Sequence, residues 1–329
     1  MEKQVSILRR LYISEIDGTA TLYFGASEEN NFDSSLFKNN VISCLKQAKE
    51  TNYMGEEHDD IPSPFPPGDN ELTVIEFAKS DGEPIGSVVR FAAHAVCANR
   101  KGSYSSDYPY YVRSLMSEKF GGISMFLNGP CGEIAPCMQD KYEGREKILG
   151  YYLAESALMA IEDKPFKQIE FLNDAKFSID LPVRKEVLDN FVNVSDALPS
   201  SLSGMRRHLE TVRLNKTLEF LREKYINGEA KHTDEISVLV GLLQINDLLI
   251  VAFPGETFYK TGKIVKESFE NINICTITEH ERTVMYLPPK EDFELGGYEA
   301  VCKLTAPNSE EILRENSISI IRKFYKIFM

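Results

Sequence analysis

The feature that most constrains the fold is a long apolar run, residues 236–253, in the last third of the chain. Valine, isoleucine and leucine dominate this run, which is interrupted once, by Asn246-Asp247. The pattern predicts two strands joined by a tight turn. The run ends at Pro254-Gly255-Glu256, and we expect Glu256 to open an amphipathic helix. The helix dipole favours a carboxylate there, and open α/β sheets bind ligands at this edge, although an ordinary N-terminal carboxylate would fit the same pattern.

A second apolar segment, residues 87–94, ends in a histidine. His94 is therefore a candidate metal ligand or general base. The segment follows a turn at Asp81-Gly82, so the pattern predicts a hairpin of strands 71–77 and 84–96. A loop with Asp107, a helix over 110–120, a strand over 123–127 and a second loop then follow. Polar residues thus gather in the loops at strand ends.

Six short motifs in these regions occur in the order found in one enzyme family. They are Phe91-Ala92-Ala93-His94, Ser106-Asp107-Tyr108-Pro109, Phe126-Leu127-Asn128-Gly129 with Gly132-Glu133-Ile134-Ala135-Pro136, Pro254-Gly255-Glu256, Tyr286-Leu287-Pro288, and Gly297-Tyr298-Glu299. Through them the chain resembles the catalytic domain of neutral, non-lysosomal ceramidases and their bacterial relatives, over residues 71–136 and 235–312.

This resemblance implies a zinc-dependent hydrolase of the amide bond of an N-acylated sphingoid base. By motif, the metal ligands would be His94, Glu256 and Tyr286. Zinc accepts mixed nitrogen and oxygen ligands, polarises carbonyl groups and lowers the pKa of bound water. Tyr298 matches a phenol that would donate a hydrogen bond to the developing oxyanion. Without the resemblance, both tyrosines would be read as core residues with satisfied hydroxyls.

Two family motifs are altered in this chain. The family's first zinc histidine lies in a Thr-His-Thr-His-Ser-Gly-Pro segment, whereas the counterpart, residues 19–27, contains no histidine. The family's nucleophilic serine lies in Gly-Asp-x-Ser-Pro, and here Ala135 takes its place. The least demanding adaptation keeps the three ligands, with Asp107 as a possible fourth, and lets an activated water replace the serine. Asp107 or Glu133 would then orient the water or the histidine.

Two other adaptations stay open. Cys131 or Cys137 would act as a nucleophile in the loop where the family has its serine, with His94 as the base. Alternatively, a further histidine would complete the metal site. The candidates are His58, His232 and His280. His58 stands in an acidic segment typical of a solvated loop.

Composition limits the setting of this chemistry. The 329 residues include 50 acidic and 37 basic ones, a net charge of -13, so we expect no nucleic-acid binding through a basic face. No apolar segment follows the first ten residues, and we therefore expect neither a signal peptide nor a membrane span, and a cytoplasmic protein. The six cysteines show no CxxC pair, which favours reduced thiols over a zinc-cysteine cluster.

We therefore expect an α/β (mixed α+β) fold, a single ceramidase-like domain over residues 1–329 with a mixed sheet covered by helices and no C-terminal β-sandwich. The loops after His94, Leu127 and Phe253 should converge. The expected function is metal-dependent hydrolysis of an amide or related acyl bond in a small-molecule or lipid-like substrate. The alternative is a catalytically inactive relative that binds a ligand or partner. The sequence indicates no oligomeric state.

Overall fold

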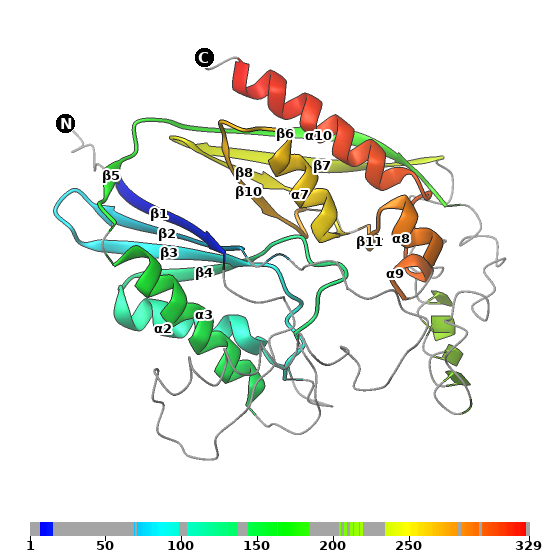
Figure 1. The fold of residues 1–329 in the computed structure, drawn as a ribbon, viewed down its shortest axis with the longest axis horizontal. Helices are drawn as coiled ribbons and strands as arrows, with labels where there is room; N and C mark the ends of the chain where they lie inside the picture. The colour runs from blue at the N-terminus through cyan, green and yellow to red at the C-terminus, as the bar shows by residue number, and fades with distance from the viewer. Residues whose placement is uncertain are drawn as a thin grey trace. The chain divides into compact units, whose positions relative to one another are not determined.

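The computed structural model describes residues 7–15, 69, 71–98, 104–136, 144–162, 164–184, 234–281, 284–295 and 298–326, with parts of 204–219. The chain divides into two compact units, residues 1–171 and 172–329. Figure 1 shows the sheet and helices of each. The single domain expected from the sequence stays a prediction. The segment 19–27, His58, Cys137 and His232 lie outside the described residues.

The first unit contains a five-stranded sheet in the order β4-β3-β2-β1-β5. Its strands are β1 (Ile7–Glu15), β2 (Glu71–Lys79), β3 (Pro84–Phe91), β4 (Ile123–Asn128) and β5 (Lys167–Gln168). All neighbours are antiparallel except β3 and β4, which run parallel. The β2–β3 hairpin turns at Gly82, whose φ of 88° favours glycine. β3 ends before His94, earlier than expected, because the His94 N–H bonds the Ile134 carbonyl instead of a strand.

Two helices, α2 (Asp107–Lys119) and α3 (Arg145–Ile161), pack on each other and on this sheet. Helical spacing places Tyr108, Val112 and Met116 on the buried side of α2. The helices approach closely at Gly150, where a Cβ atom would lie 2.6 Å from the Tyr108 carbonyl oxygen. The Tyr108 hydroxyl donates to the Ala93 carbonyl, so α2 also holds the chain that follows β3.

The second unit contains a four-stranded sheet in the order β10-β8-β7-β6. Its strands are β6 (Leu172–Pro182), β7 (Glu235–Ile245), β8 (Leu248–Ala252) and β10 (Asn273–Ile277). β6, β7 and β8 are antiparallel, whereas β8 and β10 are parallel. The expected strand pair with a turn at Asn246-Asp247 is confirmed as β7 and β8, and Asn246 adopts the positive φ of a tight turn.

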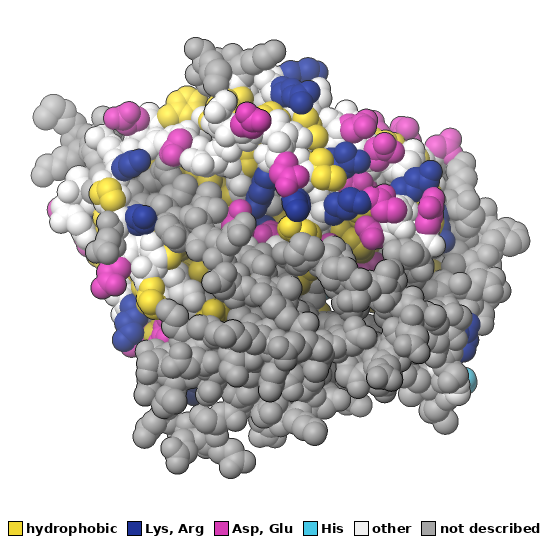
Figure 2. Space-filling view, in the orientation of Figure 1, with side chains coloured by type: hydrophobic (Ala, Val, Ile, Leu, Met, Phe, Trp, Pro, Cys, Tyr) yellow, Lys and Arg dark blue, Asp and Glu magenta, His cyan; other side chains and the backbone are white. Residues whose placement is uncertain are grey.

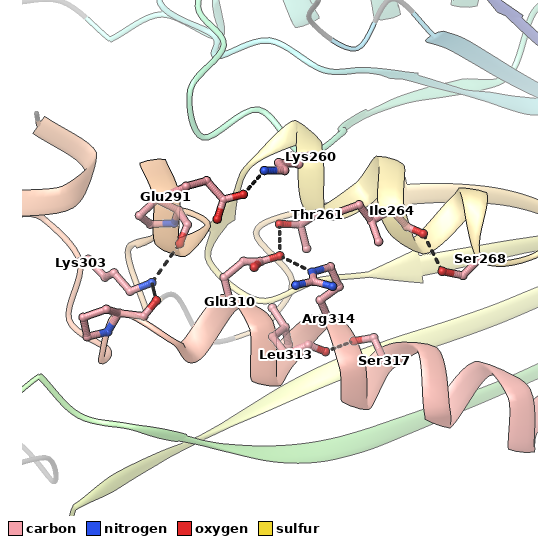
Figure 3. A network of polar contacts seen from close by, with 12 residues as sticks. Lys260, Thr261, Ile264, Ser268, Glu291, Lys303, Glu310, Leu313, Arg314 and Ser317 are labelled. Carbon is pink, nitrogen blue, oxygen red and sulfur yellow. Dashed lines mark hydrogen bonds and ion pairs between the residues drawn. The ribbon is translucent and has the colours of Figure 1, made fainter. Parts of the chain in front are cut away.

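The core of this unit lies between one face of the sheet and the helices α7 (Tyr259–Glu267) and α10 (Ser309–Lys326). Val240 and Val251 from the strands, and Phe253 directly after β8, meet Val265 and Leu313 from the helices. A buried polar network also joins the two helices, as Figure 3 shows.

In that network the Glu310 carboxylate accepts from the Thr261 hydroxyl at 2.8 Å and from Arg314 Nε at 3.0 Å. The buried carboxylate is therefore satisfied from both helices, as burial of a charge requires.

The expected mixed α/β architecture is confirmed. Across the described surface in Figure 2, acidic and basic side chains are interspersed, and no wide basic field appears on this face. None of the helices in the described residues combines the length and the apolar character that crossing a membrane requires.

Candidate functional site

Glu256 and Tyr286 lie side by side in the second unit. They occupy two short parallel strands, β9 (Glu256–Thr257) and β11 (Tyr286–Leu287), and are direct partners in the register. The Glu256 N–H donates to the Met285 carbonyl at 2.9 Å, and the Thr257 N–H donates to Thr278 Oγ1 at 3.2 Å. The expectation that Glu256 opens a helix is therefore wrong. Its N–H is used in strand pairing, and α7 begins only at Tyr259.

A tight turn at Gly255 holds Glu256 in this position. Gly255 has a φ of 62°, and a Cβ atom there would lie 2.6 Å from the Met285 carbonyl oxygen. The Gly255 carbonyl accepts from the Glu279 N–H at 2.9 Å and from Thr278 Oγ1 at 2.6 Å. Glycine is thus required both by the backbone angle and by the approach of the next strand.

The side chains of the two partners are hydrogen-bonded to each other. Burial, and then the negative charge of Glu256, raise the pKa of the Tyr286 phenol well above its ordinary value. Tyr298, in the short helix α9 (Tyr298–Val301), packs its ring edge against Tyr286, with 5.7 Å between the ring centroids. Three of the expected site residues are therefore adjacent, with Tyr286 a protonated phenol that donates to Glu256.

His94 lies in the first unit, where the loops after β3 and β4 meet. Its backbone N–H donates to the Ile134 carbonyl at 3.0 Å, and its Nε2 is 3.3 Å from the Gly132 carbonyl oxygen. The Gly129 N–H donates to the Phe91 carbonyl at 2.9 Å, which ties the starts of the two loops together. Because β3 and β4 are parallel, their carboxyl ends share one edge, and the expected convergence of these two loops is found. Convergence with the loop after Phe253 stays a prediction.

Asp107 is buried and holds the chain around His94. Its carboxylate accepts the N–H groups of Ala98 and Tyr108, and it is hydrogen-bonded to the Cys97 thiol. Burial, followed by the charge of Asp107, raises the pKa of Cys97. These contacts fix the loop 94–98. Glu133 is exposed, and the roles expected for both carboxylates in orienting water or His94 stay predictions.

Cys131 and His280 were the described candidates for an alternative nucleophile and an alternative metal ligand. Cys131 is buried, and Ala135, which the motif resemblance aligns with a nucleophilic serine, has no hydroxyl group. The imidazole of His280 lies against β7, where a Cβ atom on Gly241 would come within 2.8 Å of Nε2. Burial lowers the pKa of His280, which favours a neutral ring.

The donor set in the second unit fits part of a metal site. A carboxylate and a phenol, both oxygen donors, lie next to each other on the paired strands β9 and β11. Within the parts of the chain that the structure describes, no three His, Cys, Asp or Glu side chains gather into a group able to hold a metal ion.

Two cations near the phenols were not identified from the sequence: Lys303, which is buried, and Arg184, which is half-buried. A signal for one was present, because Lys303 interrupts the apolar run Ala300-Val301-Cys302-Lys303-Leu304. Charged residues within such runs are buried only when they have specific partners. For Arg184 no such signal is evident.

Two solved ceramidase structures have a fold similar to that of this chain. The chain is similar to the crystal structure of neutral ceramidase from Pseudomonas aeruginosa, with a TM-score of 0.58 and 14% identity over 95% of this chain and 51% of that one. A ceramidase complexed with C2 gives a TM-score of 0.59 and 13% identity over 97% of this chain and 54% of that one. No protein-family model and no curated protein matches the sequence. The chain spans about half the length of these solved structures, and the likeness establishes a ceramidase-like fold.

Proposed function

We propose that the protein is a zinc-dependent hydrolase of an amide or related acyl bond, acting on a small-molecule or lipid-like amide. The observation that carries this proposal is the hydrogen-bonded pair of Glu256 and Tyr286 on adjacent parallel strands. It occurs in a fold similar to that of ceramidases, at positions matched by short motifs.

The proposed ligands are Glu256, Tyr286 and His94. Bound zinc would act as a Lewis acid toward the substrate carbonyl and lower the pKa of a bound water. In the metal-free protein Glu256 accepts a hydrogen bond from the Tyr286 phenol, which holds the phenol oxygen beside the carboxylate. Tyr298, packed on Tyr286, would donate a hydrogen bond to the developing oxyanion. Ala135 offers no hydroxyl, so water would be the nucleophile, oriented by Asp107 or Glu133.

Backbone geometry supports a functional role for the segment before Tyr286. Positive φ angles occur at Glu279, Glu281 and Met285, with values from 59° to 61°. Such angles are unfavourable for residues other than glycine, and they concentrate at functional sites where the surrounding structure enforces them. Here the enforced segment is the one that presents Tyr286 to Glu256.

Metal content tests the proposal directly. The protein is purified without chelator or affinity tag, and its zinc is measured by elemental mass spectrometry, before and after reconstitution. We expect one zinc per chain, lost in His94→Ala and in Glu256→Ala. The exposed residues His208 and Glu267 provide matched controls, since His208→Ala and Glu267→Ala should retain zinc. Wild-type protein that takes up no zinc after reconstitution would refute the metal-dependent hydrolase.

A second candidate is an inactive relative that binds a ligand or partner. The observation that favours it is Ala135 in the loop where the family has its nucleophile. The two candidates differ in turnover: hydrolysis of N-acyl amines of varied chain length that disappears in His94→Ala would exclude the inactive relative. Zinc binding without turnover of any such amide would favour it.

A further inference from the structure

A buried lysine holds the segment that follows Tyr286. Lys303 has no exposed surface, and its Nζ donates to the Pro288 carbonyl at 3.1 Å and to the Pro307 carbonyl at 3.4 Å (Figure 3). Pro288 lies two residues beyond Tyr286, directly after β11. The ammonium group therefore fixes the chain where it leaves the strand that carries the phenol.

An arginine makes the corresponding contact with the helix that carries Tyr298. Arg184 Nη1 donates to the Ala300 carbonyl at 2.8 Å. Ala300 lies two residues beyond Tyr298, in the single turn of α9, where helix carbonyls lack partners within the helix. The backbone N–H of Arg184 also donates to the Leu304 carbonyl at 2.8 Å. Arg184 therefore lies beside the residue that follows Lys303.

The two cations face one aromatic ring. Phe293 lies in α8 (Lys290–Leu295), between the two tyrosines in sequence. Arg184 Cζ is 5.0 Å from the centroid of its ring, and Lys303 Nζ is 5.8 Å from it. Both distances are within the range of cation–π attraction. Phe293 thus links the contact that holds the Tyr286 segment to the one that holds the Tyr298 segment.

Burial of the Lys303 ammonium group is energetically unfavourable unless hydrogen bonds or an opposite charge compensate it. The hydrogen bonds of Lys303 go to two carbonyls, and within the described part of the chain no carboxylate bonds it directly. The charge of Glu310 attracts it from further away. Desolvation lowers the pKa of Lys303 to about 8, and the nearby charge of Arg184 acts in the same direction. An apolar side chain would fill this space without that cost, but it would leave the Pro288 and Pro307 carbonyls without their donor.

We propose that Lys303 and Arg184 are positioning residues that fix Tyr286 and Tyr298 relative to each other, with Phe293 coupling them. The inference deepens the proposed function, because the relative position of the two phenols would set one zinc ligand against the oxyanion donor. Neither cation is a catalytic residue in this arrangement. Each acts through the backbone carbonyl that it holds.

The test observes the phenols directly and needs neither zinc nor substrate. The full chain is labelled with 3-fluorotyrosine, and the ¹⁹F resonances of positions 286 and 298 are assigned from their loss in Tyr286→Phe and Tyr298→Phe. Spectra of metal-free Lys303→Met and Arg184→Met are compared with wild type, with circular dichroism as the check of folding. The matched control is Lys260→Met, which removes an exposed lysine paired with Glu291 on α8.

Each variant has its own expected signature. Lys303→Met should displace mainly the Tyr286 resonance, and Arg184→Met mainly that of Tyr298, while the other tyrosines and Lys260→Met stay unchanged. If either cation variant fails to fold, Phe293→Leu replaces it, and both resonances should move. Folded variants in which neither resonance moves, or in which all tyrosine resonances move together, would overturn the positioning role.

A separate arm distinguishes this inference from the proposed function. Zinc added to wild-type protein should shift the Tyr286 resonance if Tyr286 is a ligand. An unchanged spectrum would count against the zinc-dependent hydrolase, while the selective shifts in the metal-free variants would still support the positioning of the two phenols.

Discussion

Tyr286 is hydrogen-bonded through its phenol to the carboxylate of Glu256, and the two residues face each other on the parallel strands β9 and β11. Burial and the Glu256 charge both favour the protonated phenol. A metal ion at this pair would have to displace that proton, whereas the carboxylate is already an anionic donor. The pair would therefore couple the proposed metal binding to pH.

The first prediction follows from this coupling. Because the pKa of Tyr286 is raised, the phenol is protonated at neutral pH, and zinc binding should release its proton. Zinc affinity should then increase as pH rises, until the free phenol ionises. Calorimetry in two buffers with different ionisation enthalpies measures the protons released. Tyr286→Phe should bind zinc at least about 10-fold more weakly and release fewer protons. Equal proton release in both proteins would show that zinc does not displace the Tyr286 proton.

The neighbouring phenol should affect turnover more than metal binding. Tyr298 contacts Tyr286 through its ring, and its proposed role is to donate to the oxyanion. Removal of one such donor typically lowers kcat about 100-fold. We expect Tyr298→Phe to retain zinc and to lose turnover by that factor with any amide that wild type hydrolyses. Tyr110→Phe, at an exposed tyrosine of the other unit, is the control. Loss of zinc from Tyr298→Phe would instead indicate a structural role.

The turn before Glu256 allows a test of the strand pairing. Gly255→Ala combines a positive φ with a Cβ atom 2.6 Å from the Met285 carbonyl oxygen. The two effects together should lower the free energy of unfolding by about 2 to 4 kcal/mol. At Gly82 the φ is 88° but no atom lies within 4 Å of the added Cβ, so Gly82→Ala should cost only about 1 kcal/mol. Chemical denaturation compares the two. Equal costs would mean that β11 does not constrain Gly255.

The sequence predicted the elements that carry a local signal. β7 and β8 were found because branched residues fill both strands and Asn246-Asp247 interrupts them. The helix α2 was found, but it begins at Asp107, before the expected residue 110. Pro109 obscured this start, although proline is tolerated in a first turn, where N–H groups lack helical partners.

The pairing of β9 with β11 could not be predicted in the same way. Each strand has two residues, too few for an alternating pattern, and their partners are distant in sequence. The local pattern at Glu256 therefore favoured the start of a helix. Motif resemblance nevertheless placed Glu256, Tyr286 and Tyr298 in one site, because it depends on residue identity and order rather than on periodicity.

Substitution of Asp107 can distinguish a structural role of this carboxylate from a catalytic one. Its carboxylate accepts two backbone N–H groups and contacts the Cys97 thiol in a buried position. Asp107→Asn replaces one acceptor oxygen with a donor, and should lower the free energy of unfolding by about 1 to 3 kcal/mol. Glu118→Gln, an exposed carboxylate on the same helix, should be nearly neutral. Unchanged stability combined with lost turnover would contradict the structural role and favour the orienting role.

The buried ammonium of Lys303 predicts a pH dependence of stability. Its pKa is about 8 in the folded protein and 10.5 as the ordinary value. Between these two pH values the unfolded chain binds more protons than the folded one, so the stability contribution of Lys303 should increase as pH rises. The full difference of about 2.5 pKa units corresponds to at most about 3 kcal/mol.

Denaturation of wild type and Lys303→Met at pH 7.5 and pH 10 measures this contribution. Tyrosine ionisation affects both proteins alike and cancels in the comparison. Wild type should gain stability relative to Lys303→Met as pH rises, because only wild type relieves the burial of a charge by losing its proton. Lys260→Met, which removes an exposed lysine, should follow wild type. A stability difference that stays constant over this range would mean that Lys303 keeps an ordinary pKa, and that the carbonyls of Pro288 and Pro307 fully compensate its burial.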